Sequence, residues 1–166
     1  MNDRVLVPAY VGLGSNLDEP TVQLRRAFDA LGGLPQTRLV ATSALYQNPP
    51  MGPQEQPDFV NAVAGLLTTL APTALLAALQ AIEERHGRRR DGSRWGPRVL
   101  DLDLLLYGDR RLQTEMLILP HPGLAERAFV LWPLCEVAPD LRLPGGARVA
   151  SLATALGAAD LRRLDD

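Results

Sequence analysis

Hydrophobic positions at the start of the chain recur first with the period of a strand and then with that of a helix. The mainly apolar run over 4–13 predicts a buried strand that ends in a glycine-containing turn. Apolar residues after this turn recur at helical spacing, and the predicted helix has Asn16 or Asp18 as its cap and Pro20 in its first turn. Gly32 ends this helix, because glycine tolerates the backbone that follows a last helical turn.

The middle of the chain predicts three more strands and a second helix. The strands are expected over 38–46, 59–68 and 99–107. The second helix begins at Pro72 and ends at Gly87. The order β-α-β-β-α-β predicts an α+β fold with a ferredoxin-like core, in which a mostly antiparallel sheet is flanked by helices.

Two loops and a weaker C-terminal pattern complete the predicted organisation. The segment 48–58 contains four prolines and predicts a stiff, ordered loop, and 87–97 predicts a second long loop that is rich in arginine. Further on, 127–135 is a short apolar element and 149–156 a last helix. Because the sequence has neither internal repeats nor a linker, it predicts a single domain over residues 1–166.

Composition is that of an ordinary globular protein and argues against several classes. The hydrophobic content of 46% and the charged content of 22% argue against a disordered chain. The net charge of −2 argues against a general nucleic-acid binder, and no apolar span reaches the roughly 18 residues of a membrane helix. The single cysteine excludes an internal disulfide framework. We therefore expect a cytoplasmic protein with no nucleic-acid or membrane partner.

Basic residues are concentrated in one segment of the chain. All 17 are arginines, and six of them fall within 85–98, beside a single acidic residue, Asp91. Arginine forks bind phosphate oxygens bidentately, so this segment is a candidate phosphate-binding loop. A solvated basic loop is the alternative. The absence of lysine excludes a Schiff-base lysine and a P-loop lysine.

Asp101 and Asp103 lie two positions apart in a predicted strand and therefore share one face of it. The leucines expected on the opposite, core-facing side are Leu100, Leu102, Leu104 and Leu106. Adjacent carboxylates repel each other unless a cation lies between them, and carboxylates beside phosphate suit magnesium. A solvated strand face is the alternative. Together with the arginine segment, the pair favours phosphoryl transfer.

Other polar and aromatic residues are weaker candidates. Phe59 and Asn61 share a strand face, where a ring could stack on a planar ligand and an amide could read its edge. Core packing is the alternative for Phe59. Gln80 and Glu83 lie one turn apart on the second helix, which a solvated helix face explains equally well. His121 could contact phosphate or be hydrogen-bonded within its own loop.

Two further features have a simple structural interpretation. His86 lies at the end of the second helix, where a positive charge would complement the helix dipole. Gly12 and Gly14 lack a third glycine at position 17, so they form neither a Rossmann fingerprint nor a Walker loop.

The segments that carry these residues resemble the 6-hydroxymethyl-7,8-dihydropterin pyrophosphokinase family. They are GLGSNL (12–17), NPPMGPQEQPDFVN (48–61), RWGPRVLDLDLLLYG (94–108) and PHPGLAERAFVLWPLCEVAPD (120–140), in the family's order and spacing over roughly residues 5 to 145. The resemblance implies transfer of pyrophosphate from ATP to the hydroxymethyl group of a reduced pterin, with release of AMP, in folate biosynthesis. It also implies two magnesium ions and ATP as co-substrate, and we expect a monomer.

The resemblance implies roles for individual residues as well. The catalytic positions are Arg88, Arg98, Asp101 and Asp103, and the metal ligands among them are Asp101 and Asp103. The ATP-binding positions are Gln80, Glu83, Arg88, Arg90, Arg94, Trp95, Arg98, Leu104, His121 and Arg127. The pterin-binding positions are Asn48, Pro49, Met51, Phe59, Asn61, Trp95 and Phe129. The departures are Phe59, where a tyrosine is common, and Met116, Ile118 and Pro122, where some members have arginine, threonine and tyrosine.

Two other functions remain as alternatives. One is a ferredoxin-like RNA-binding module that uses the arginine segment, although the few aromatic residues, the negative net charge and the acidic pair argue against it. The other is an ATP hydrolase or nucleotidyl transferase with the same metal site, which would release ADP or pyrophosphate.

Overall fold

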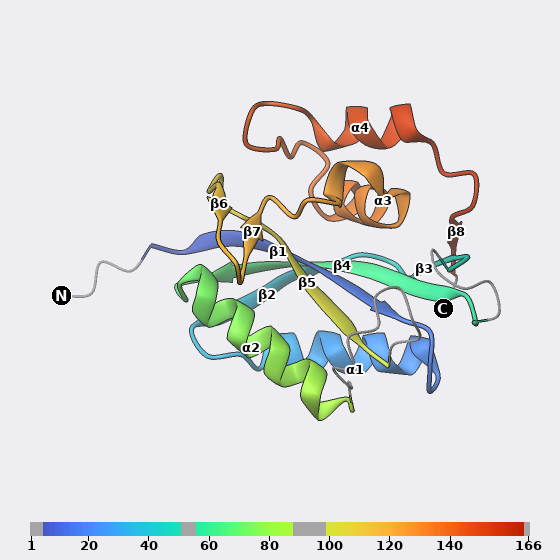
Figure 1. The fold of residues 1–166 in the computed structure, drawn as a ribbon, viewed down its shortest axis with the longest axis horizontal. Coiled ribbons are helices and arrows are strands. Elements are labelled where there is room, and N and C mark those ends of the chain that lie inside the picture. Colours follow the sequence, from blue (N-terminus) through green and yellow to red (C-terminus); the bar gives the residue numbers. More distant parts are fainter. Residues whose placement is uncertain (1–4, 51–55, 88–98, 165–166) are drawn as a thin grey trace.

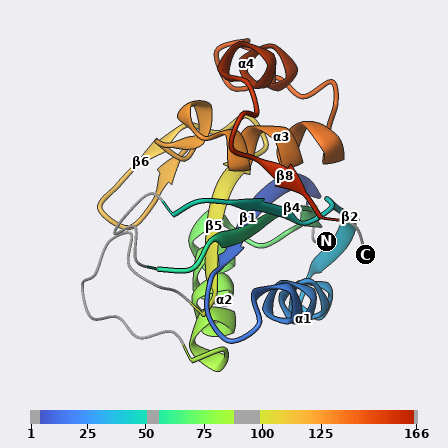
Figure 2. The same cartoon turned by 90° about the vertical axis from the view of Figure 1, so that its right-hand side faces the viewer.

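The computed structural model describes residues 5–50, 56–87 and 99–164, and an antiparallel sheet covered by helices forms its centre (Figure 1). In chain order the elements are β1 (Val7–Ser15), α1 (Pro20–Gly32), β2 (Thr37–Thr42), β3 (Tyr46–Asn48), β4 (Phe59–Thr68), α2 (Pro72–Arg85), β5 (Asp101–Tyr107), β6 (Leu112–Gln113), β7 (Ile118–Leu119), the 3-10 turn η1 (Leu124–Glu126), α3 (Ala128–Val137), α4 (Val149–Leu156) and β8 (Arg162–Arg163). Helices α1 and α2 lie on one face of the sheet, and α3 and α4 lie on the other (Figures 1 and 2).

The sheet has the predicted topology. β1 lies between β5 and β4, and β2 and β3 both pair with the far edge of β4. All of these pairings are antiparallel. The α+β class and the β-α-β-β-α-β order of a helix-flanked sheet are therefore confirmed.

The strand predicted over 38–46 is in fact two strands, β2 and β3. The chain leaves the regular ladder at Ser43, whose hydroxyl accepts a hydrogen bond from the Val63 amide at 2.9 Å. This side-chain contact takes the place of a ladder hydrogen bond, so the regular pairing with β4 is interrupted at Ser43 and resumes in β3.

The start of α1 also differs from the prediction. Its cap is Glu19, in a left-handed conformation and without a side-chain hydrogen bond, rather than Asn16 or Asp18. The Asn16 amide instead donates to Gln56 Oε1 at 2.9 Å and to the Pro57 carbonyl at 3.0 Å. The residue thus ties the turn after β1 to the end of the proline-rich loop.

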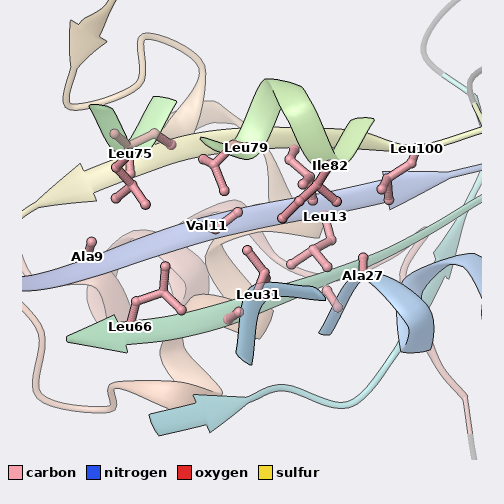
Figure 3. Packing of buried hydrophobic residues seen from close by; sticks show 14 of the residues in the cluster. Ala9, Val11, Leu13, Ala27, Leu31, Leu66, Leu75, Leu79, Ile82 and Leu100 are labelled. Carbon is pink, nitrogen blue, oxygen red and sulfur yellow. The ribbon is translucent and has the colours of Figure 1, made fainter. Parts of the chain in front are cut away.

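Each face of the sheet has its own hydrophobic core. Under α1 and α2, side chains such as Leu31, Leu79 and Ile82 pack on β1 and β4 (Figure 3). On the other face, Leu131 and Leu134 of α3 are fully buried in a second cluster with the sheet. Because the central strands are buried on both sides, their sequences are apolar almost without interruption.

A bulge in β5 changes which leucines face which core. The pairing of β1 with β5 shifts by one residue between Tyr10 and Val11, which leaves Leu105 as the extra residue. Leu106 was expected on the same side as Leu100, Leu102 and Leu104, but this prediction is wrong. Leu105 and Leu106 both belong to the α3-side cluster, whereas the earlier leucines pack under α1 and α2.

The C-terminal segment packs back onto the sheet. The Trp132 indole of α3 donates to the Gly157 carbonyl after α4 at 2.9 Å, and β8 pairs with β3 at the edge of the sheet. The predicted apolar element over 127–135 is helix α3, and the predicted last helix has the observed bounds of α4. Among the helices of the described ranges, none is long and apolar enough to cross a membrane.

Candidate active site

Two glycines of β1 form the floor of a pocket on the α3 side of the sheet. Gly14 pairs with Asp101 of β5 and with Asn61 of β4, the two strands that flank β1. Gly12 pairs with Asp103 of β5. Residues directly opposite each other in a ladder face the same side of the sheet. The carboxylate pair and Asn61 therefore stand on the two sides of a floor that carries no side chains.

The space above Gly14 is occupied closely enough that any side chain there would displace Asn61. A Cβ atom at this position would lie 2.8 Å from Asn61 Oδ1 and 4.0 Å from Phe59 Cδ1. Sequence reasoning missed this role, since it placed the glycines in a turn after the strand and tested them against phosphate-binding motifs; this turn is wrong, because β1 continues through both glycines to Ser15. The available signal was two glycines spaced two apart inside a strand, which marks a close approach of another group to one sheet face.

Two asparagines form the polar end of this pocket. Asn61 donates a hydrogen bond from its amide to Asn48 Oδ1, and the Asn48 amide donates to the Pro49 carbonyl at 3.0 Å. Both side chains are buried, and the pairing of Asn48 with Phe59 aligns β3 with the start of β4. The donors and acceptors of both amides are thus held in fixed orientations.

The pocket brings together four of the five described residues that the family resemblance assigns to the pterin, namely Asn48, Phe59, Asn61 and Phe129. Its complete described lining is Gly12, Leu13, Gly14, Asn48, Phe59, Asn61, Ala62, Asp101, Asp103, Leu105, Arg127, Phe129 and Val130. Phe59 from β4 and Phe129 from α3 supply two aromatic rings to the pocket. These two elements are far apart in the sequence and come together only in the folded chain. Pro49 lines an adjoining cavity that shares Asn48 and Phe129 with the pocket.

A second pocket lies on the other side of Asp103. It is lined by Leu76, Leu102, Asp103, Leu104, Glu115, Met116, Leu117, Ile118, His121 and Pro122, and so lies between α2, β5 and the β6–β7 hairpin. Leu104 and His121, both expected on the nucleotide side, are in this lining. Asp103 lines both pockets, and its side chain is exposed, whereas Asp101 is half-buried.

Glu83 is buried and does not lie on a solvated helix face, which was one interpretation of its sequence position. It is 2% exposed, and its Oε2 accepts a hydrogen bond from the Leu102 amide at 2.8 Å. Leu102 lies between the two aspartates, so Glu83 supports the strand that presents them. In the described part of the chain, neither Gln80 nor Glu83 lines one of the two pockets.

The donors around Asp101 and Asp103 suit a hard divalent cation. Within the described ranges, no three His, Cys, Asp or Glu side chains converge in a way that could hold a metal ion. A site with two carboxylates leaves several coordination positions for water and phosphate oxygens, which is the pattern of magnesium at phosphoryl-transfer sites. The residues present therefore fit magnesium better than zinc, which takes three or four side-chain ligands.

His121 is held in one tautomer at the edge of the second pocket. Its Nδ1 accepts a hydrogen bond from the Gly123 amide at 3.0 Å, so the proton of the neutral ring is on Nε2. Burial and, secondarily, the charge of Arg127 lower the pKa of His121. The neutral ring can donate one hydrogen bond, from Nε2, to a phosphate oxygen.

Arg127 lines the first pocket and its charge lies near His121, which lines the second. Its guanidinium carbon is 6.0 Å from the centre of the Phe129 ring. The close packing of the guanidinium on Gly123, where a Cβ would lie 2.5 Å from the guanidinium carbon, places it beside the His121 loop. An arginine in this position can contact an anion that crosses from one pocket to the other.

We expect His121 to titrate below the ordinary histidine pKa of about 6.5. Since its pKa is lower in the folded chain, its contribution to stability is complete above the unfolded value and is lost as the pH falls through the folded value. His121→Asn should therefore lose less unfolding free energy than the wild type between about pH 7.5 and about pH 5.5. Denaturant unfolding at both values measures this, with an NMR titration of the ring. Equal losses in the two proteins would contradict the prediction.

His86 does not supply the positive charge expected at the end of α2. Its Nδ1 lies 2.8 Å from Gln23 Oε1, and burial together with Arg26 and Arg85 lowers its pKa. The ring is therefore a neutral hydrogen-bonding partner that joins α2 to α1.

Several residues assigned by resemblance lie outside the described residues. They are Met51, Arg88, Arg90, Arg94, Trp95 and Arg98. Most belong to the segment between Gly87 and Val99, which connects α2 to the strand that carries the aspartate pair. Their roles stay predictions.

Comparisons with known proteins show which family the chain is similar to. Residues 10–139 match the family model of 7,8-dihydro-6-hydroxymethylpterin-pyrophosphokinase. The chain is similar to the 2-amino-4-hydroxy-6-hydroxymethyldihydropteridine pyrophosphokinase of Pseudomonas aeruginosa, with 55% identity over 155 residues, which are 93% of this chain and 95% of the relative. The corresponding Haemophilus influenzae protein is 49% identical over 147 residues, or 89% of this chain and 91% of that one.

The fold is also similar to solved structures. The Plasmodium falciparum HPPK-DHPS structure with pteroate superimposes with a TM-score of 0.73 at 13% identity, over 93% of this chain. The match covers 43% of the Plasmodium chain, so this chain spans less than half of its length. At this identity the likeness supports the fold alone.

Proposed function

The chain belongs to the 7,8-dihydro-6-hydroxymethylpterin-pyrophosphokinase family, and from that membership we propose a reaction in which the pterin and the nucleotide meet at Asp103. The enzyme transfers a pyrophosphoryl group to 6-hydroxymethyl-7,8-dihydropterin, in folate biosynthesis. The observation that carries the proposed arrangement is the position of Asp103, which lines both pockets. A carboxylate shared by two pockets is suited to a group that passes between them.

The first pocket is the proposed pterin site. A pterin is planar and has a pyrimidine edge of alternating donors and acceptors. Phe59 and Phe129 would contact its faces, and the fixed amides of Asn48 and Asn61 would read its edge. The bare floor at Gly12 and Gly14 would let the ring lie close to the sheet.

The second pocket is the proposed nucleotide site, with ATP as the donor. Its apolar lining would receive the base, and Asp103 and His121 would lie toward the phosphates. Asp101 and Asp103 would hold magnesium, two ions by the family resemblance, and the metal would neutralise charge on the phosphates. Arg88, Arg90, Arg94 and Arg98 are proposed to neutralise further charge, and Trp95 and Met51 to complete the pterin site.

The chemistry needs positioning more than a strong base. The pterin hydroxyl oxygen attacks the β-phosphorus of ATP, the bond from that phosphorus to the α-phosphate oxygen breaks, and AMP leaves as the hydroxyl proton passes to water. The enzyme's contribution is to align both substrates and to balance negative charge. We further propose that residues 1–166 act as a single-domain, monomeric, cytoplasmic enzyme that binds no nucleic acid.

The nucleotide products should distinguish this reaction from the alternatives. With ATP, magnesium and 6-hydroxymethyl-7,8-dihydropterin, we expect AMP and a pterin diphosphate in equal amounts, and no AMP without the pterin. Chromatography of the reaction mixture measures both products. ADP or phosphate formed without pterin would instead indicate an ATP hydrolase, and a salt-sensitive gel shift with single-stranded RNA would favour the RNA-binding alternative.

A further inference from the structure

The segment beyond the family match reaches the proposed pterin site through β3. This strand is three residues long and ends at Asn48. On one side, β3 pairs with the part of β4 that carries Phe59 and Asn61, and on the other side β8 pairs with it through Arg162 and Arg163. A strand this short contributes few ladder hydrogen bonds of its own, so its position depends on its neighbours.

One carboxylate connects three elements at this edge of the sheet. Glu136, in the last turn of α3, accepts a hydrogen bond from the Tyr46 hydroxyl at 2.6 Å through Oε1. Its Oε2 accepts from the Ala44 amide at 2.9 Å and lies 3.6 Å from the Arg163 guanidinium of β8. Hydrogen bonds to a charged acceptor are stronger than neutral ones, so this junction holds its geometry well.

The Tyr46 contact is a hydrogen bond with a fixed direction. Burial, with the hydrogen bond and charge of Glu136, raises the pKa of Tyr46 to about 12. The phenol therefore keeps its proton near neutral pH and always donates to the carboxylate. Tyr46 pairs directly with Asn61, so the hydrogen bond between Tyr46 and Glu136 is anchored on a residue opposite the polar end of the pocket.

The junction links the elements that carry opposite walls of the pocket. Helix α3 presents Phe129 from its first turn and Glu136 from its last, and β3 presents Asn48. When Glu136 holds β3 against α3, it also sets the separation of Asn48 from Phe129. A planar ligand stacked between aromatic rings is sensitive to such a gap, since a displacement of about 1 Å can cost a large factor in binding or rate.

We propose that Glu136 is a positioning residue for the pterin pocket, which it shapes through β3 without touching the ligand; this rests on the proposed function. The absence of Glu136 from the described lining of the pocket agrees with an indirect role. Its contacts to Tyr46, Ala44 and Arg163 also give the C-terminal segment a function, because β8 closes the outer edge of β3.

The test compares binding of the two substrates to Glu136→Ala. We expect the dissociation constant of 6-hydroxymethylpterin to rise about ten-fold, whereas that of a non-hydrolysable ATP analogue changes less than about two-fold. In turnover assays, KM for the pterin should rise about as much with kcat nearly unchanged. Asp140→Ala is the matched control, because Asp140 follows the same helix, is 99% exposed and pairs with Arg148 at 3.8 Å.

Two milder variants keep the test decisive if Glu136→Ala unfolds. Glu136→Gln can still accept from Tyr46 but presents an amide donor to the Ala44 N–H, so its loss of pterin affinity should be intermediate. Tyr46→Phe removes one arm of the junction, and its effect should not add to that of Glu136→Ala in the double variant, since both changes break one contact.

The outcomes separate this inference from the proposed function. If the wild type binds 6-hydroxymethylpterin and the Glu136 and Tyr46 variants bind it equally well, the inference is wrong and the function stands. Equal losses of pterin and ATP-analogue affinity, together with a lower melting temperature, would show a general structural role and would also overturn the inference. A wild type that does not bind the pterin would overturn the proposed function itself.

Discussion

Asp103→Ala should lower the rate of pyrophosphoryl transfer by about a thousand-fold or more while the fold stays intact. Asp103 lines both pockets, and removal of its carboxylate would leave Asp101 alone to hold the proposed magnesium at the junction of the two sites. Its side chain is exposed, so the substitution opens no cavity, and the free energy of unfolding should change by less than about 0.5 kcal/mol. Single-turnover assays over a range of magnesium concentrations, with denaturant unfolding, measure both effects.

Asp109→Ala is the control for this substitution. Asp109 is an exposed aspartate in the turn after β5, and it lines neither pocket in the described part of the chain. It should retain wild-type turnover and the wild-type dependence on magnesium. If Asp103→Ala behaves in the same way, the proposed metal site is wrong.

Gly14→Ala should raise the dissociation constant of 6-hydroxymethylpterin by about a hundred-fold. The new Cβ would lie 2.8 Å from Asn61 Oδ1, so the Asn61 side chain must move and its hydrogen bond to Asn48 must change. The methyl group also occupies the floor on which the ring would lie. Binding of an ATP analogue should be nearly unchanged, because Gly14 lines the first pocket and is not in the described lining of the second. Calorimetric titration with each ligand measures this difference.

Gly65→Ala provides the matched comparison within the same sheet. Its Cβ would make ordinary contacts of 3.5 Å with Ala41 and Tyr10, away from both pockets. We expect both ligands to bind this variant as they bind the wild type. A Gly14→Ala protein that binds the pterin as well as Gly65→Ala does would show that the floor is not part of the pterin site.

The fold could be predicted where local patterns are strong. β4 has the predicted bounds, and α2 begins at the proline that marks a first helical position. The bulge at Leu105 could not be predicted. Residues 104–106 are all leucine, so the alternation of side chains between the two faces of a strand does not indicate where an extra residue is inserted. The split at Ser43 depends on a contact with Val63, twenty residues further along the chain.

Part of the lining of the first pocket could be predicted from the sequence, but its packing could not. The aspartate pair, Phe59 and Asn61 could be recognised from spacing, since residues two apart in a strand share a face. Glu83 could not be distinguished from a solvated glutamate, because its partner is a backbone amide on β5. The spacing of Gly12 and Gly14 hints at the floor, but the junction at Glu136 has no local pattern, because its partners Ala44 and Tyr46 come from another part of the chain.

The bulge at Leu105 separates two structural requirements that share one strand. Upstream of it lie the aspartates that face the pockets; downstream lie Leu106 and Tyr107, which pack on opposite sides of the sheet, and the Tyr107 hydroxyl donates to the Leu70 carbonyl. Because the extra residue resets the phase of the strand, Leu105 and Leu106 both face the α3 side, whereas Leu104 and Tyr107 face the side of α1 and α2. One inserted leucine therefore lets a single strand present both carboxylates to the pockets and still direct two adjacent leucines into the α3-side core.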